Sequence, residues 1–270
     1  MRLSLTTFFN PILQMIKRIA SLLMAVPVLF GGFLWLGVES ANAGQRKFAY
    51  NYEVLTAPLG SIEFENWVTW RRGNGKDQGN FRHEMEFGVT DRLQLAVYMV
   101  DWQWTDAPGE KKVKYEHTGV EVVYRLSNPI TDVVGSAVYG EVKVGDGVMA
   151  WEGKLLLQKN LGRLTLTYNA TVEAVWEGST LGQLNERSGE LAQTVGISYE
   201  IDAHVNLGLE FLQEIDLPNW EAAGRSIIFG GPNISLRKGR YFATITGLFR
   251  LSDQADEPAM QVRGIFGVDF

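Results

Sequence analysis

The sequence predicts an all-β protein: an antiparallel transmembrane β-barrel of about twelve strands, preceded by a cleaved signal peptide. Three observations predict this fold. Apolar and polar residues alternate with a period of two along most of the chain, as in strands with one apolar and one polar face. The polar faces carry many charges, whereas the apolar faces carry almost none. The chain also opens with a basic and then strongly apolar leader.

Residues 1–43 form the predicted signal peptide. Arg2, Lys17 and Arg18 supply positive charge, and a nearly continuous apolar run follows them. The run ends in Ala-Asn-Ala at 41–43, which matches the small-residue cleavage site of secretory signals. An uncleaved membrane anchor is the alternative, because the apolar run is almost long enough to span a bilayer.

Residues 44–60 are predicted as a periplasmic N-terminal segment, since their periodicity is weak. Two placements are open for this segment: it packs into the mouth of the barrel as a partial plug, or it lies loosely beneath the barrel. The pattern of residues favours neither placement.

Residues 61–270 form the predicted barrel. In the first run, SIEFENWVTW at 61–70, the apolar residues share one face and Glu63 and Glu65 share the other. The run NFRHEMEFGV at 80–89 repeats this pattern, and about ten further runs follow. Short and long stretches alternate between the runs, which is typical of outer-membrane barrels with short periplasmic turns and longer extracellular loops.

The charges indicate which face points inward. A Lys or Arg in the hydrocarbon layer costs roughly 2–4 kcal/mol at mid-depth, so the charged faces are predicted to line the lumen. Acidic residues outnumber basic residues on these faces by ten to five. The predicted lumen-lining residues are Glu63, Arg82, Glu84, Glu86, Glu121, Arg125, Glu141, Lys143, Glu152, Lys154, Glu173 and Arg263.

Aromatic residues at the two ends of the apolar faces predict membrane-interface girdles. One girdle comprises Trp70, Trp151 and Trp176, and the other comprises Tyr124, Tyr199 and Tyr241. Strict counting puts Trp102 and Trp104 on the polar face. Either a β-bulge or the start of a loop would explain these two positions.

The chain ends in MQVRGIFGVDF at 260–270, where Phe266, Val268 and Phe270 share the outward face. This ending resembles the C-terminal assembly signal that outer-membrane barrels present to the barrel-assembly machinery. The stretches at 48–70 and 81–99 resemble an uncharacterised Gram-negative outer-membrane β-barrel family. They are also distantly similar to the barrel family associated with phenol-degradation operons. The resemblance implies a fold and a compartment, and it transfers no catalytic residue.

These features predict location in the cell outer membrane of a Gram-negative bacterium. The expected partners are outer-membrane lipid, lipopolysaccharide and the barrel-assembly machinery, with small solutes as candidate cargo. Removing the leader takes three basic residues and one acidic residue from totals of 25 and 31, leaving a net charge of −8. Nucleic acid is therefore not expected as a partner, because it requires a basic patch.

We expect no enzymatic activity, no cofactor and no metal site. The sequence contains no cysteine, and His83, His117 and His204 lie on separate runs without the spacing of a metal site. Outer-membrane phospholipases place a serine close to their histidine, but FRHEMEF at 81–87, the stretch around His83, contains no serine or asparagine.

Two functions remain open. The first is a narrow channel for passive or facilitated passage of small solutes, with a mildly acidic lumen. Twelve strands lie between the filled interior of small barrels and the aqueous channel of barrels with 16–18 strands. The alternative is a closed structural or surface-loop-displaying barrel without transport activity, in which acids and bases pair across the lumen.

Overall fold

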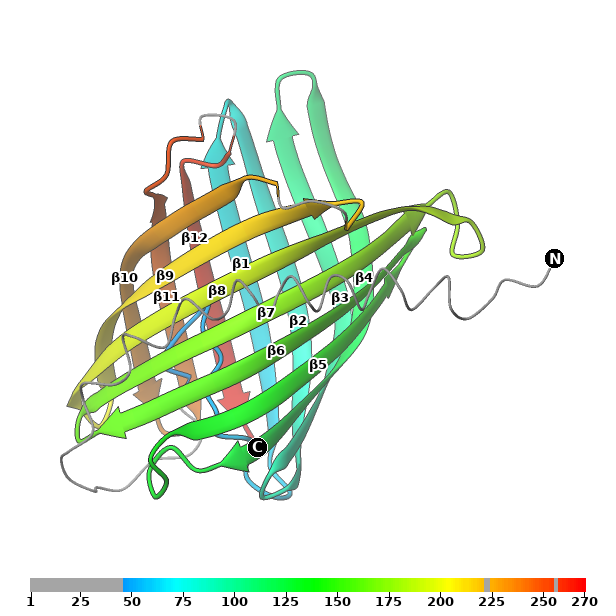
Figure 1. The fold of residues 1–270 in the computed structure, drawn as a ribbon. Coiled ribbons are helices and arrows are strands. Elements are labelled where there is room, and N and C mark those ends of the chain that lie inside the picture. The colour runs from blue at the N-terminus through cyan, green and yellow to red at the C-terminus, as the bar shows by residue number, and fades with distance from the viewer. Residues whose placement is uncertain (1–45, 221–223, 255–256) are drawn as a thin grey trace.

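The computed structural model describes residues 46–220, 224–254 and 257–270. Within this part, twelve antiparallel strands form a closed barrel in which the last strand pairs with the first (Figure 1). The predicted all-β barrel and its strand number are therefore confirmed. The predicted signal peptide at 1–43 lies outside the described residues.

Each strand pairs with its neighbours in sequence, so the barrel is a simple up-and-down meander closed by β1 and β12. No helix of the described chain is long and apolar enough to cross a membrane. The strands are β1 (Ile62–Gly73), β2 (Lys76–Thr90), β3 (Leu93–Ala107), β4 (Glu110–Ser127), β5 (Gly135–Gly145), β6 (Val148–Leu161), β7 (Leu164–Gly178), β8 (Leu184–Asp202), β9 (Val205–Pro218), β10 (Ser226–Lys238), β11 (Tyr241–Arg250) and β12 (Met260–Asp269).

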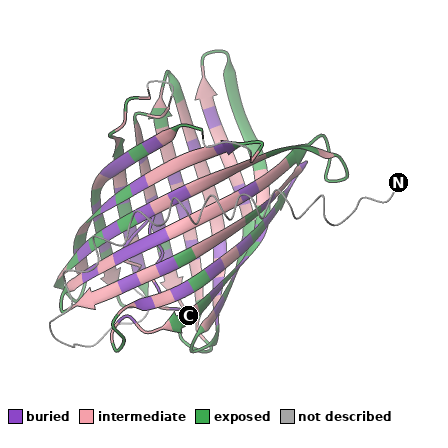
Figure 2. Ribbon diagram, viewed as in Figure 1, coloured by how far each residue is buried: buried purple, intermediate pink, exposed green. Residues whose placement is uncertain are grey.

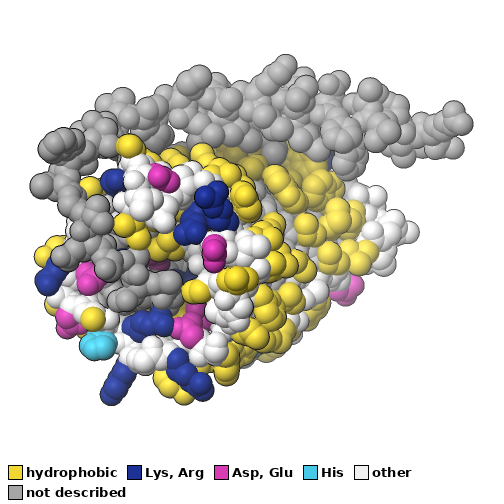
Figure 3. All heavy atoms as spheres, turned by 90° about the horizontal axis from the view of Figure 1, so that it is seen from below, with side chains coloured by type: hydrophobic (Ala, Val, Ile, Leu, Met, Phe, Trp, Pro, Cys, Tyr) yellow, Lys and Arg dark blue, Asp and Glu magenta, His cyan; other side chains and the backbone are white. Residues whose placement is uncertain are grey.

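Buried and exposed residues alternate along the strands (Figure 2). In contrast to a soluble protein, the exposed residues are the apolar ones. On β5, Tyr139 and Glu141 are buried, whereas Val138 and Val142, which flank this stretch, are 43% and 48% exposed. Hydrophobic side chains cover the outer wall that is visible in Figure 3, and charged side chains gather at the barrel end facing the viewer. Apolar side chains outside and polar side chains inside are the arrangement of a barrel in lipid.

The two ends of the barrel differ in their connections. We call the end at which β12 stops the C-terminal rim, and the other end the hairpin rim. The sequence predicts long loops at the hairpin rim, with the short turn after β5 as the one exception, but β1–β2 and β3–β4 are also joined there by only two residues each. At the C-terminal rim, β4 and β5 are joined by the longer connection 128–134. The predicted alternation of short and long loops is therefore wrong for these pairs.

The difference has a physical reason. Beyond the hydrocarbon layer both faces of a strand meet water, so the alternation of apolar and polar residues fades although the strands still pair. Between β1 and β2, Asn74 and Gly75 both have positive φ, at 54° and 71°, as a type I′ hairpin turn requires. The paired strands continue into the turn, and Figure 1 shows the β3–β4 hairpin projecting well beyond the rim.

A β-bulge accounts for the tryptophans of β3. The register between β3 and β4 shifts between Tyr98 and Asp101, and the pairing with β2 shifts beside Glu84. These shifts place Trp102 opposite Phe81, where the two rings stack at 3.9 Å between centroids. Of the two explanations that the sequence left open, the bulge is the one observed.

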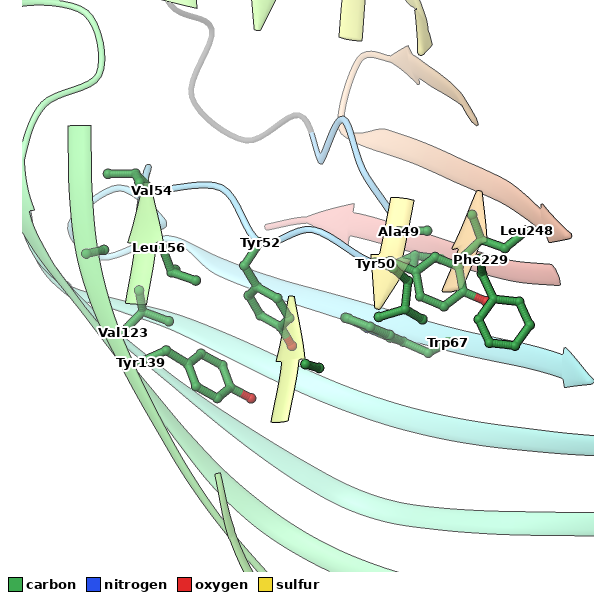
Figure 4. Close-up of a cluster of buried hydrophobic side chains, with 14 of the residues drawn as sticks. Ala49, Tyr50, Tyr52, Val54, Trp67, Val123, Tyr139, Leu156, Phe229 and Leu248 are labelled. Carbon is green, nitrogen blue, oxygen red and sulfur yellow. The ribbon is translucent and has the colours of Figure 1, made fainter. Parts of the chain in front are cut away.

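The chain before β1 runs through the interior of the barrel. We call residues 46–60 the lumen segment. Its side chains Ala49, Tyr50, Tyr52 and Val54 are buried in a cluster with residues of the barrel wall (Figure 4). Of the two placements left open for residues 44–60, residues 46–57 occupy the interior rather than lying beneath the barrel, whereas Pro58, Leu59 and Gly60 are exposed just before β1.

Candidate functional site: the lumen and the segment that crosses it

The predicted lumen-lining residues lie on the inward-facing side of their strands. They alternate with exposed apolar residues, and the cross-strand register places them side by side on the inner wall. Arg125 lies near the C-terminal rim, where its guanidinium donates to the backbone oxygen of Asp91. The complete set is Glu63, Arg82, Glu84, Glu86, Glu121, Arg125, Glu141, Lys143, Glu152, Lys154, Glu173 and Arg263.

Nine carboxylates form a row on this inner wall, which we call the carboxylate row. Each member lies directly opposite the next on the neighbouring strand, and only Ala96 on β3 interrupts the row. Because barrel strands tilt by roughly 35–45° from the barrel axis, a row that crosses them also advances along that axis. It runs from the C-terminal rim toward the hairpin rim through Asp269, Glu63, Glu86, Glu121, Glu141, Glu152, Glu173, Glu190 and Asp216.

Cations flank the middle of the carboxylate row, as is needed because like charges placed directly opposite destabilise a sheet. Lys143 lies 2.9 Å from Glu173, 3.6 Å from Glu141 and 3.9 Å from Glu152. Lys154 lies 2.6 Å from Glu152. These lysines neutralise part of the row and leave it acidic overall.

The lumen segment is anchored on the buried carboxylate of Glu210, on β9. Glu210 accepts hydrogen bonds from the backbone N–H groups of Ala49, Tyr50 and Asn51 at 2.8–2.9 Å. The side-chain amide of Asn51 donates to the same carboxylate at 2.9 Å. Asn233 and Thr246 donate to it from the barrel wall. A single carboxylate therefore satisfies three consecutive backbone donors that would otherwise be buried without partners.

Amide side chains of the wall pair with the rest of the segment backbone. Asn169 accepts from the Tyr52 N–H at 2.7 Å and donates to the Tyr52 carbonyl at 3.0 Å. Gln158 accepts from the Val54 N–H at 2.8 Å. Gln94 accepts from the N–H of Ala57 at 2.7 Å. The wall thus replaces the strand ladder that this segment lacks.

Two glycines make room for the segment. Phe48 is fully buried, and a Cβ atom at Gly196 on β8 would lie 2.7 Å from its ring. A Cβ atom at Gly88 on β2 would collide with the carbonyl of Pro58. The backbone of the wall therefore approaches the segment more closely than a side chain would allow.

Aromatic residues of the segment fill the centre of the lumen (Figure 4). The Tyr52 ring lies 5.0 Å from that of Tyr139 and 6.2 Å from that of Trp67. The ammonium of Lys154 lies 4.1 Å from the centroid of Tyr52, within the range of a cation–π contact. The Tyr50 hydroxyl donates to the side-chain oxygen of Gln261 at 3.3 Å.

A cavity of about 300 Å³ lies beside the segment, toward the hairpin rim. This volume is at the lower end of the range for small-molecule sites, roughly 300–1,000 Å³. Tyr50, Tyr52 and Trp67 form its floor. Its walls carry seven carboxylates and five lysines or arginines. Glu190 and Glu214 also line this cavity, and neither forms an ion pair within the described chain.

The predicted interface residues lie on the outer face. Trp151, Tyr124, Tyr199 and Tyr241 are exposed, and Trp70 and Trp176 are partly exposed. Trp151 and Trp176 lie on the neighbouring strands β6 and β7 near the hairpin rim, whereas the tyrosines lie toward the C-terminal rim. At the end of β12, Phe266, Val268 and Phe270 also face outward. Both sets occupy positions where an interface anchor or an assembly tag would be accessible.

The family can be assigned once the barrel is described. A model described as "Family of unknown function (DUF6662)" matches residues 40–262, which is most of the chain. This protein belongs to the DUF6662 family. A search of the curated proteins found no match.

Solved structures similar to this DUF6662 protein are bacterial outer-membrane barrels. The NanC porin has a TM-score of 0.52 and 9% sequence identity, with 77% of this chain and 98% of that chain covered. The autotransporter NalP translocator domain of Neisseria meningitidis has a TM-score of 0.41 and 12% identity, with 78% and 87% covered. OmpT of Vibrio cholerae has a TM-score of 0.40 and 7% identity, with 78% and 96% covered. At these identities the similarity to the NanC porin establishes the fold alone, that of an antiparallel transmembrane β-barrel.

The residues that hold the lumen segment are absent from the sites predicted by sequence. The sequence does place Glu210 in the lumen, since it is an acid on the polar face of its run. Asn169, Gln158 and Gln94 are inward-facing amides, which are compatible with any polar lumen. Only the path of the segment distinguishes them as anchors.

Proposed function

We propose that this DUF6662 protein is a narrow outer-membrane channel for small solutes that favours cations and neutral molecules over anions. The carboxylate row carries the proposal, because it offers acidic groups from one rim of the barrel to the other. Rings and rows of carboxylates bias a pore toward cations. The cavity beside the lumen segment, with its excess of carboxylates, would be the place where a solute first binds.

In this proposal the described conformation is closed. The lumen segment crosses the interior, and its Phe48, Ala49 and Asn51 are 0–1% exposed. Passage then requires the segment to leave at least part of its site. The C-terminal rim would face the periplasm and the hairpin rim the exterior, as expected for a chain that is inserted from the periplasmic side.

The test is conductance of the purified full-length protein in planar bilayers, with and without displacement of the segment. The variant Gly196→Leu places a side chain where the ring of Phe48 lies and should push the segment out. The matched control is Gly247→Leu on β11, where a new Cβ meets no atom within 4 Å. Gly196→Leu should carry a much larger current than the unsubstituted protein, and a KCl gradient should give a cation-selective reversal potential.

A folded Gly196→Leu barrel without current, or one that selects anions, would contradict the channel proposal. Such a result would favour the second candidate, a closed barrel that displays surface loops. The specific observation behind that candidate is the dense pairing in the lumen, for example Arg46 with Glu65 at 2.9 Å and with Glu86 at 3.2 Å.

The proposal also covers the expected partners of the barrel. Outer-membrane lipid and lipopolysaccharide would surround the barrel, and the barrel-assembly machinery would insert it. The distant likeness to barrels of phenol-degradation operons remains a prediction about kinship and assigns no solute. We propose no catalytic role, in line with the scattered histidines.

A further inference from the structure

Three buried glutamates converge on the β1–β2 hairpin, near the C-terminal rim. Glu65 and Glu84 lie directly opposite each other, and Glu86 lies two residues further along β2. One carboxylate oxygen from each residue lies within 4.8 Å of the other two. Glu65 and Glu84 are 0% exposed and Glu86 is 5% exposed. We call these three residues the glutamate trio.

Two members of the trio have partners. Glu65 accepts from the indole N–H of Trp67 at 2.6 Å and pairs with Arg46 at 2.9 Å. Glu86 accepts from Gln94 at 2.7 Å and from Arg46 at 3.2 Å. Arg46 belongs to the lumen segment, so the segment supplies the cation for both carboxylates.

The third member is different. Both carboxylate oxygens of Glu84 are buried, and neither has a hydrogen-bond partner within the described chain. Arg82, the cation two residues away on β2, is engaged by Asp101 at 2.9 Å. A buried carboxylate without a partner is strongly unfavourable, so a positive charge or a proton must neutralise it.

The charge balance favours a divalent ion. Three carboxylates carry three negative charges and Arg46 returns one positive charge, which leaves two negative charges in a site closed to water. One divalent cation neutralises both remaining negative charges, whereas a single proton on Glu84 neutralises only one of them.

The spacing of the oxygens points the same way. Ca²⁺ binds oxygen at roughly 2.3–2.6 Å, so oxygens on opposite sides of the ion lie about 4.6–5.2 Å apart and adjacent ones lie closer. The trio, with its oxygens within 4.8 Å, fits this range. A proton shared between two carboxyl groups would draw the oxygens to about 2.5–2.7 Å and form a hydrogen bond. Glu84 forms none.

We propose that Glu65, Glu84 and Glu86 bind a divalent cation of the Ca²⁺ type, with Glu84 as the ligand dedicated to the ion. Ca²⁺ is favoured over Mg²⁺, since Mg²⁺ retains several waters and this site is closed to solvent. Arg46 binds two of the same carboxylates, so the ion and the lumen segment are held by one set of ligands. Neither the channel proposal nor its failure affects this site.

Terbium provides the direct probe, because it substitutes for Ca²⁺ and is excited by energy transfer from a nearby tryptophan. Trp67 donates to Glu65 and is therefore adjacent to the site. The full-length folded protein, freed of metal with EDTA, should show saturable terbium luminescence with one high-affinity site, and Ca²⁺ should displace the terbium. Ca²⁺ should also raise the melting temperature, because a ligand that binds only the folded state stabilises it.

The variant Glu84→Gln should weaken terbium affinity at least tenfold, whereas Glu186→Gln, which changes an exposed carboxylate of β8 outside the trio and the cavity, should leave it unchanged. Equilibrium dialysis of the unsubstituted protein against Ca²⁺ decides the matter even if Glu84→Gln does not fold. Dialysis without bound Ca²⁺, or equal binding by Glu84→Gln and the unsubstituted protein, would overturn the proposal and indicate a proton on Glu84.

Discussion

Asn51 donates twice to the same oxygen of Glu210, from its backbone N at 2.8 Å and from its side-chain Nδ2 at 2.9 Å. The two residues are separated by 159 positions in the sequence. Glu210 belongs to the barrel wall and Asn51 to the lumen segment, so this pair joins the two parts of the interior. The first prediction concerns the strength of that attachment.

Replacing Glu210 with Gln should loosen the lumen segment. An amide has a single acceptor oxygen, so several of the donors that converge on Glu210 would lose their partner. Each buried donor without a partner costs about 1–3 kcal/mol. We expect the free energy of unfolding, measured with urea in lipid, to fall by about 3 kcal/mol, and limited proteolysis to cut within residues 46–60. Glu190→Gln serves as the control, and equal protection of both variants would contradict the role given to Glu210.

Truncating Phe48 should release the segment by a different route. Phe48 is fully buried, and Phe→Ala substitutions at such positions cost about 3–5 kcal/mol. Phe48→Ala should therefore lower the free energy of unfolding and raise the single-channel opening frequency in bilayers. Phe249→Ala is the control, because Phe249 lies on the outer face and is 51% exposed. Unaltered gating in a destabilised Phe48→Ala barrel would separate the segment from channel closure.

The free carboxylates of the cavity should set ion selectivity. Glu190 and Glu214 face the cavity and have no ion-pair partner in the described chain. Changing both to Gln in the Gly196→Leu background should reduce the cation-to-anion permeability ratio, with a change in stability below about 1 kcal/mol because no ion pair is broken. The reversal potential in a tenfold KCl gradient measures this ratio. An unchanged potential would place the selective region elsewhere in the lumen.

The end of β12 should govern insertion rather than export. Phe270 is 67% exposed on the outer face and its backbone N–H donates to the carbonyl of Ile62 at 2.8 Å. Phe270→Asp should lower the amount of barrel in the outer membrane several-fold, while the exported protein still reaches the periplasm, as cell fractionation would show. Leu59→Asp, at an exposed position before β1, is the matched control. Normal insertion of Phe270→Asp would remove the assembly role of this residue.

The inward and outward faces could be predicted from sequence because the period of a strand is local. Lys143 lies between two valines, and this alternation alone places its side chain on the inward face, whatever the neighbouring strands are. The length of the β1–β2 and β3–β4 hairpins was not predicted correctly, since strands that project into water lose the apolar half of the pattern.

The candidate site depends on contacts that no local pattern reports. The carboxylate row requires the register of ten strands, which the turns and the bulge in β3 set together. The lumen segment has weak periodicity because each of its residues meets a different part of the wall, and Tyr52 finds Asn169 across 117 positions. Its backbone partners could not be predicted from sequence for that reason.

The contacts of the lumen segment impose an order on folding. Its backbone partners Glu210, Asn169, Gln158 and Gln94 belong to β9, β7, β6 and β3, and Arg46 also reaches β10 and β11 through Ser235 and Thr244. These strands offer a complete set of partners only after the barrel wall has curved around them. The segment that is synthesised before every strand must therefore be the last part of the interior to dock.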